Sequence, residues 1–283
     1  MKRFFIITNK SKDPDMKETD RIRNYLESHG AICEVAEIER VCAGNGPEYK
    51  CEVPDSSECC IVLGGDGTML QAARNVLEQN IPLIGVNLGT LGYMTEVELS
   101  EAESAMDKLL NDDYEIEDRM MLQGILCQGE EKGKKNFALN DIVIARCSSL
   151  QAYNFNVYVN DQPLTSYKAD GVILSSPTGS TAYNMSAGGP IVDPKAQILL
   201  LTPICSHTAN SRTIVLSEND KVTIEIGVGR ADSVQRLEAS FDGGKRFIMQ
   251  SGDRIDISRA EQVTRILKLS SESFLNILRK KLV

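Results

Sequence analysis

Continuous runs of apolar residues fill the first third of the chain and alternate with segments of helical spacing. The runs lie at 3–8, 31–35, 59–63 and 81–86. Such runs are typical of strands that are buried on both faces of a parallel sheet. In the segments between these runs, the spacing of the apolar residues predicts helices over about 15–28 and 69–79. Alternating strands and helices favour an α/β domain with an open parallel sheet, whose ligands bind at the carboxyl ends of the strands.

The pattern changes after a helix that we expect at about 100–110, opened by a capping box at Ser100 and Glu103. Apolar and polar positions then alternate with a period of two, which predicts short strands. These are expected at 114–120, 122–127, 137–145, 154–159, 212–216, 222–226, 237–241, 247–250 and 263–269. A mostly β domain, a sandwich, is the favoured architecture.

The last segment, 271–281, has apolar residues at helical spacing and predicts a C-terminal helix that packs back on the first domain. We therefore expect an α/β domain over 1–113 that includes 271–283, and a β-sandwich domain over 114–270.

A glycine-rich turn, Gly64-Gly65-Asp66-Gly67-Thr68, connects the predicted strand at 59–63 to the following helix. Glycine lets a ligand approach the backbone, and the amides that open a helix favour anionic oxygen, so the turn is a candidate phosphate site. Asp66 would repel phosphate unless a metal ion lay between them or unless it accepted a hydroxyl proton. Both interpretations indicate phosphoryl transfer. The alternative is an ordinary turn in which Asp66 caps the helix.

Other nucleotide motifs are absent from the sequence. It contains no Gly-x-x-x-x-Gly-Lys-Ser/Thr loop, and the glycines at 64, 65 and 67 do not form the dinucleotide fingerprint Gly-x-Gly-x-x-Gly. Hydride transfer on a standard Rossmann fingerprint therefore loses support.

A second unusual segment runs from Asp170 to Pro190 and contains a hydroxyl-rich turn at 178–181. Hydroxyl groups beside free helix amides, followed by the flat ring of Tyr183, suit a nucleoside. The alternative is a helix cap with a core tyrosine. Asn140-Asp141 interrupts an apolar strand, where the amide could pair with a base edge and the carboxylate with ribose hydroxyls; an edge strand or bulge is the alternative.

Composition narrows the possible partners and the compartment. The 283 residues are 42% hydrophobic and carry a net charge of −9, so we expect no broad basic surface for nucleic acid. Anionic substrates would need local positive charge from side chains such as Lys168 and Arg212.

No apolar run approaches the roughly 18 residues of a membrane helix, so we expect a cytoplasmic protein with no membrane partner. Two histidines exclude a histidine-rich metal site, and the eight cysteines are expected to be buried free thiols.

Together, the glycine turn, Asn140-Asp141 and the segment from Asp170 to Pro190 resemble the NAD kinase family in order and spacing, over most of the chain. The glycine turn alone is shared with diacylglycerol and sphingosine kinases and with phosphofructokinases, whereas 177–183 is much more specific. Further similarity lies at 87–93, at 202–204 with His207 and Arg212, and at 240–243.

This resemblance implies the two-domain fold with a returning C-terminal helix. It also implies transfer of the γ-phosphoryl group of ATP, or in some members of inorganic polyphosphate, to the 2′-hydroxyl of the adenosine ribose of NAD. Mg²⁺ is the divalent ion expected with ATP. Family members are commonly dimers or tetramers, so we expect a homodimer or homotetramer.

By the same resemblance, Asp66 approaches the 2′-hydroxyl as the base, and Gly65 and Gly67 shape the phosphate loop. The other residues expected to contact the substrate are Tyr93, Asn140, Asp141, Lys168, Asp170, Thr178, Thr181, Ala182, Tyr183 and Ser186. No metal ligand is assigned to the protein. Asp141 stands where the family usually has glutamate, and Lys168 stands where some members carry arginine, which exchanges a planar fork for a point charge.

Two rival functions are a lipid or sugar kinase with the same glycine turn and a non-catalytic NAD or NADP sensor. A lipid kinase would need an exposed apolar entrance for its substrate, which the hydroxyl-rich turn at 178–181 does not provide. A sensor would not require the carboxylate of Asp66.

Overall fold

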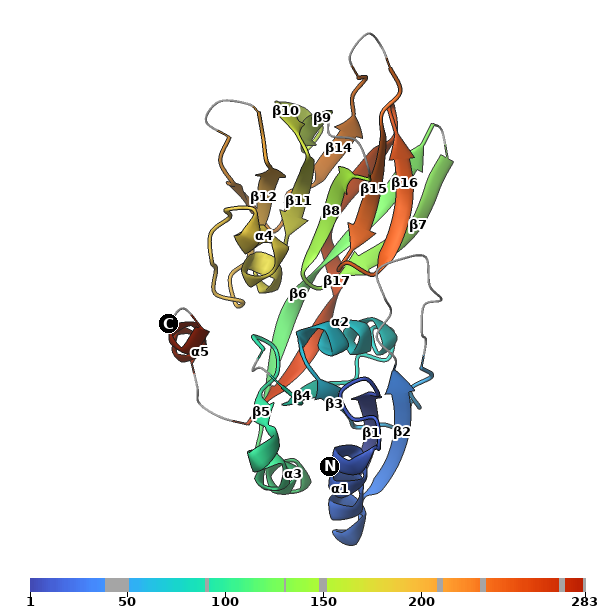
Figure 1. The fold of residues 1–283 in the computed structure, drawn as a ribbon, viewed down its shortest axis with the longest axis vertical. Coiled ribbons are helices and arrows are strands. Elements are labelled where there is room, and N and C mark those ends of the chain that lie inside the picture. Colours follow the sequence, from blue (N-terminus) through green and yellow to red (C-terminus); the bar gives the residue numbers. More distant parts are fainter. Residues whose placement is uncertain are drawn as a thin grey trace. The chain divides into compact units, whose positions relative to one another are not determined.

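The computed structural model describes residues 1–38, 51–89, 92–129, 131–147, 152–207, 211–229, 233–269 and 273–281. The chain divides into two compact units, Met1–Arg119 with Gln262–Val283 and Met120–Glu261. Both divisions fall inside long strands, β6 (Glu115–Gln128) and β17 (Arg254–Lys268), which are labelled in Figure 1. The domain limits expected from the sequence, at 113 and 270, stay a prediction.

The first unit is built on a parallel sheet, as expected. Its strands lie in the order β2 (Ile32–Ile38), β1 (Arg3–Asn9), β3 (Cys59–Gly64) and β4 (Leu83–Asn87). The end of β17 and the short β5 (Val97–Glu98) both pair with β4, also in parallel. The carboxyl ends of β1, β3 and β4 therefore lie along one edge of the sheet.

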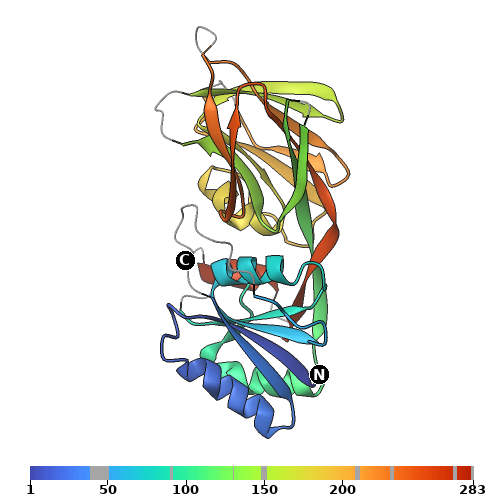
Figure 2. The ribbon, with the colours of Figure 1, turned by 90° about the vertical axis from the view of Figure 1, so that its right-hand side faces the viewer.

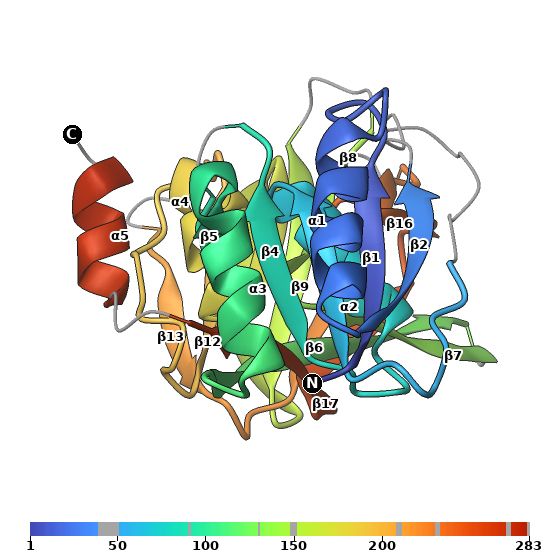
Figure 3. The same cartoon turned by 90° about the horizontal axis from the view of Figure 1, so that it is seen from below.

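Helices cover both faces of this sheet. In Figures 2 and 3, α1 (Lys17–Ser28) and α3 (Ala102–Leu110) lie together on one face, and α2 (Asp66–Asn75) lies on the opposite face in Figure 2. A 3-10 turn, η1 (Leu99–Glu101), leads into α3. The residues at this N-terminus form no side-chain capping hydrogen bond, so the predicted capping box was wrong. Apolar side chains from the strands, α1 and α3 form one core, which includes Ile22, Ile61 and Met106.

The second unit is a sandwich of antiparallel strands, again as expected. One sheet has the order β13 (Ile214–Ser217), β12 (Ile198–Ile204), β11 (Gly171–Ser175), β8 (Asp141–Arg146), β15 (Arg236–Phe241) and β16 (Lys245–Gln250). The facing layer contains β10 (Gln162–Ala169), β9 (Tyr153–Val159), β14 (Val222–Ile226), the first part of β17, β6 and β7 (Glu131–Ala138). A continuous apolar core fills the space between the layers.

Several predicted strand boundaries were wrong. The strands expected at 114–120 and 122–127 are the single strand β6, and β10, β12 and the first half of β17 were not predicted. β12 is a continuous apolar run rather than an alternating one, so the period-two pattern misses it. The strand expected at 137–145 is interrupted at Leu139-Asn140, between β7 and β8.

The predicted C-terminal helix is present as α5 (Phe274–Lys281), within the first unit. None of its described residues is buried, and Lys281 Nζ lies 4.7 Å from the centre of the Tyr93 ring. Within the described ranges, no helix has the length and apolar content that crossing a membrane requires.

Candidate active site

The glycine turn forms the start of α2, three residues earlier than the sequence pattern predicts. Gly65 is the N-cap in an extended conformation, and Asp66 is the first helical residue. A Cβ atom on Gly64 would lie 2.3 Å from Thr68 Oγ1, so the strand can approach the helix this closely only with glycine. The first hydrogen bonds of α2 run from the Thr68 and Met69 amides to Gly65 O, so the amides before Thr68 precede the helical ladder and present a dipole that favours anions.

The loop after β4 holds the carboxylate of Asp66. Asp66 Oδ2 accepts a hydrogen bond from the Tyr93 amide at 2.8 Å, and Oδ1 accepts one from the Met94 amide at 3.0 Å. A Cβ atom on Gly92 would lie 1.9 Å from Asp66 Oδ1, so only glycine lets the loop come this close. The two glycine-bearing segments that sequence analysis singled out thus meet at this carboxylate. Tyr93 contributes its backbone amide to Asp66, while its ring contacts Lys281.

In the second unit, a single carboxylate fixes the corner between β7 and β8. Asp242 accepts hydrogen bonds from the amides of Leu139, Asn140 and Asp141, at 2.8, 2.7 and 3.2 Å. Asp242 has a φ of 50° at the β15–β16 turn, a conformation that asparagine and aspartate tolerate better than most residues. The corner explains why two polar residues interrupt an apolar strand.

The hydroxyl-rich turn packs directly on this corner. Ser176 donates its amide to Asn140 O at 2.8 Å and its hydroxyl to Leu139 O. A Cβ atom on Gly179 would lie 2.1 Å from Asn140 O. Because glycine removes that obstacle, η2 (Thr178–Thr181) touches the backbone of Asn140. The two segments that the sequence suggested for nucleoside binding are therefore neighbours.

Two buried side chains here have oxygens with no hydrogen-bond partner in the described part of the chain. Asn140 Oδ1 and Thr178 Oγ1 are both unpartnered, in residues only 8% and 7% exposed. An unsatisfied buried polar atom costs about 1–3 kcal/mol. A ligand that supplies donors, such as the amino group of a purine or a ribose hydroxyl, would recover that cost.

Asp141 lies beside these groups and is itself buried, at 5% exposed. Burial, reinforced by the neighbouring Asp242 carboxylate, raises the pKa of Asp141 to about 7. Tyr183 keeps 45% of its surface exposed, which leaves its ring available for stacking. Burial, with Cys205, Asp141 and Asp170 nearby, raises the pKa of the Tyr183 hydroxyl. These electrostatic contacts place Asp170 and Asp141 near the tyrosine, and Asp170 also pairs with Arg146 at 3.1 Å.

The remaining expected residues fall into two groups. Thr181 and Ala182 are half-buried at the junction of η2 and α4 (Tyr183–Ser186), and Ser186 is exposed in that short helix. Lys168 instead lines a separate hollow of about 300 Å³ in the same unit, with Asn154, Asn156 and Ser166 among its neighbours.

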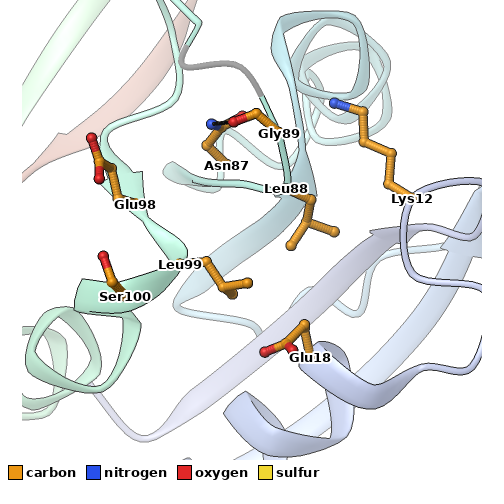
Figure 4. Close-up of a pocket in the computed structure, with 8 residues that line it drawn as sticks. All are labelled: Lys12, Glu18, Asn87, Leu88, Gly89, Glu98, Leu99 and Ser100. Carbon is orange, nitrogen blue, oxygen red and sulfur yellow. Dashed lines mark hydrogen bonds between the residues drawn. The ribbon is translucent and has the colours of Figure 1, made fainter.

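Three residues of functional interest were not among those predicted. Asp242 lies in the segment 240–243, where the family resemblance was the available signal. Lys12 and Asn87 line a pocket of about 420 Å³ in the first unit, shown in Figure 4. Asn87 ends β4 and lies in the segment 87–93, which carried family similarity, whereas the signal for Lys12 was positional, because it lies three residues after the end of β1 at the carboxyl edge of the sheet. No three His, Cys, Asp or Glu side chains of the described residues gather in a way that could hold a metal ion.

Two family models match the chain. The ATP-NAD kinase N-terminal domain matches residues 13–114, and the ATP-NAD kinase C-terminal domain matches residues 139–269. The NAD kinase of Agathobacter rectalis is 47% identical over 285 residues, covering 100% of this chain and 99% of its own. The NAD kinase of Lachnospira eligens is 45% identical over 294 residues, covering both chains completely.

Solved structures share the fold. Yeast NADH kinase, crystallised with NADH, superposes with a TM-score of 0.81 at 23% identity, covering 99% of this chain and 86% of its own. An NAD kinase from Archaeoglobus fulgidus, crystallised with ATP, gives a TM-score of 0.75 at 22% identity, covering 99% of this chain and 98% of its own. Two matching domain models and relatives of nearly half identity along the whole length lead to one conclusion: the chain belongs to the NAD kinase family.

Proposed function

We propose that this protein transfers the γ-phosphoryl group of ATP to the 2′-hydroxyl of the adenosine ribose of NAD, giving NADP. The main support for NAD as the phosphoryl acceptor is the pair of buried, unpartnered oxygens on Asn140 and Thr178, beside the buried Asp141. Together they offer acceptors to a base edge and to ribose hydroxyls, and the exposed ring of Tyr183 offers a stacking surface.

Asp66 receives the proton of the 2′-hydroxyl in this proposal. Its two hydrogen bonds from the amides of Tyr93 and Met94 fix the carboxylate, and its oxygens keep lone pairs for a substrate hydroxyl. A carboxylate is a weak base for an alcohol. Asp66 therefore acts by orienting the hydroxyl and accepting its proton late, which a loose phosphoryl-transfer transition state permits.

The phosphates of the donor bind at the start of α2, where the amides beside Gly65 and Gly67 favour negative charge. A divalent cation, Mg²⁺ by expectation, would neutralise charge on the donor phosphates. No side chain of the protein is assigned as its ligand. Inorganic polyphosphate offers the same chemistry as ATP and is the alternative donor. By family resemblance the enzyme is a cytoplasmic homodimer or homotetramer.

The test is direct. Purified protein is incubated with NAD, ATP and Mg²⁺, and NADP is detected with an NADP-specific dehydrogenase. We expect NADP to accumulate in proportion to enzyme. A lipid or sugar kinase would consume ATP only with its own acceptor, and a sensor would bind NAD without forming NADP. Either result would overturn the proposal. Replacing ATP with polyphosphate in a parallel reaction separates the two donors.

A further inference from the structure

Lys12 lies at the glycine turn, although it is far from that turn in sequence. Its position follows from the end of β1, where the Lys12 and Asp13 amides both donate to Asn9 O, at 2.9 and 3.0 Å. The Asn9 side chain in turn donates to Thr68 Oγ1 at 3.1 Å, which ties this loop to the start of α2. Lys12 Nζ consequently lies 3.0 Å from where a Cβ atom on Gly65 would be.

The ammonium group of Lys12 forms no ion pair with any described carboxylate. The nearby Lys10 differs, since its Nζ pairs with Glu37 at 2.6 Å. Lys12 Nζ also lies 3.5 Å from the Cβ position of Gly89, in the loop after β4. An unpaired cation is therefore placed between the two glycine-bearing loops, close to backbone that has no side chains to obstruct a ligand.

The pocket beside Lys12 contains a second sign of a ligand. Asn87, at the end of β4, is 6% exposed, and its Oδ1 has no hydrogen-bond partner among the described residues, while its Nδ2 donates to Gly89 O. Both side chains line the same pocket of about 420 Å³ (Figure 4). Glu18 and Glu98 line it too, and Glu18 pairs with Arg21 at 3.2 Å. Lys12 is the one cation among the described lining residues.

We propose that Lys12 binds the phosphate chain of the phosphoryl donor over the glycine turn, with Asn87 Oδ1 accepting a hydrogen bond from a hydroxyl or amino group of the nucleoside part of ATP. The inference rests on the proposed function for the identity of the donor. A negative charge of several units next to helix amides still needs a counter-charge from the protein, and a lysine supplies a point charge that suits phosphate. The two glutamates on the other side of the pocket oppose the anion and so restrict where it can lie.

The experiment compares Lys12→Met, Lys12→Arg and the matched control Lys10→Met in steady-state assays with NAD, ATP and Mg²⁺. We expect Lys12→Met to raise the KM for ATP about 10- to 100-fold, the range of a lost charge-assisted hydrogen bond. The KM for NAD should change less than about twofold, because Asn140, Asp141 and Thr178, which are proposed to bind its nucleoside, are in the other unit. Lys12→Arg should recover most of the loss, and Lys10→Met should resemble the unmodified enzyme.

A binding measurement keeps the inference separate from the proposed activity. Calorimetric titration with inorganic tripolyphosphate should show weaker binding to Lys12→Met than to the unmodified protein and to Lys10→Met. If the unmodified enzyme makes no NADP, the proposed function fails, and this titration still tests Lys12. If tripolyphosphate binding and the KM for ATP are both unchanged in Lys12→Met, the assignment of Lys12 is overturned. Lys12 is exposed, so the variant should unfold at the same temperature as the parent.

Discussion

The carboxylate of Asp66 is held in place by the protein and can still accept a hydrogen bond from a substrate. Two backbone amides hold it in one orientation, and Gly92 packs against it without a side chain. A carboxylate has about four lone-pair sites, so two accepted hydrogen bonds leave room for a substrate hydroxyl. The group is therefore positioned by the protein before any substrate arrives, which lowers the entropic cost of alignment.

Replacing Asp66 with asparagine tests the catalytic role. Asp66→Asn should retain NAD binding while turnover falls about 10²-fold or more, because the amide cannot take the proton of the hydroxyl. Calorimetry with NAD and steady-state kinetics measure the two effects separately. Gly92→Ala should reduce turnover in the same manner, since the new Cβ atom would displace the carboxylate. Near-normal turnover of Asp66→Asn would remove Asp66 from its role.

Asp141 should make the stability of the free protein depend on pH. Its pKa is about 7 in the folded chain and near the ordinary 3.8 when unfolded. Between these values the folded state binds more protons than the unfolded state, so the free energy of unfolding falls as pH rises from about 4 to 7. The total fall should be of the order of a few kcal/mol.

Urea denaturation at a series of pH values measures this contribution of Asp141. Asp141→Asn cannot ionise, so its free energy of unfolding should lack the decline that the unmodified protein shows between about pH 4 and 7. Equal pH dependence in the two proteins would contradict the raised pKa of Asp141.

At the scale of elements, the corner between β7 and β8 depends on a residue far away in sequence. Asp242, in the β15–β16 turn, accepts all three amides of 139–141, while Ser176 holds the carbonyl side of the same corner. The corner is thus a product of three chain segments. Its side chains Asn140 and Asp141 can face a ligand because their backbone groups are already satisfied.

Asp242→Ala should therefore weaken NAD binding without direct contact between Asp242 and NAD. We expect the KM for NAD to rise at least about 10-fold and the free energy of unfolding to fall by about 2–4 kcal/mol, since hydrogen bonds to a charged group contribute about 1.5–3 kcal/mol each and are not additive. The KM for ATP should change less than about twofold. If instead the KM values for ATP and NAD rose equally, Asp242 would not be specific to the acceptor site.

At the scale of the whole molecule, NAD binding should raise the free energy of unfolding of the protein. A ligand present at 100 times its Kd adds about 2.7 kcal/mol to the free energy of unfolding. The unmodified protein and Asp66→Asn should both gain this stabilisation in thermal unfolding with NAD. Asn140→Ala should not, yet it should fold normally without ligand, because Asn140 Oδ1 has no partner among the described residues. A full NAD-induced shift in Asn140→Ala would exclude this asparagine from the site.

Each unit has its own apolar core, and the chain passes between the units inside β6 and β17. Periodicity alone did not indicate these crossings. The residues of β6 predict two short strands that are separated at residue 121. The first half of β17 contains charged residues such as Arg254 and Arg259, which obscure the alternation of apolar and polar positions. Strands of 14 and 15 residues are stabilised by pairing with different neighbours along their length, which local sequence does not record.

Local patterns along the chain were enough to predict the fold class and the chemistry. Buried apolar runs between helices favoured a parallel sheet, and the glycine turn with Asp66 indicated phosphoryl transfer. These are local properties, because hydrophobic period and glycine conformation depend on near neighbours. Three contacts became visible only in the folded chain: Gly92 leaves space for the Asp66 carboxylate, Asp242 holds the backbone at Asn140, and Lys12 reaches the glycine turn. Each of these contacts joins residues 26 to more than 100 positions apart, and such pairs are set by packing and backbone hydrogen bonding across strands, which no local pattern encodes.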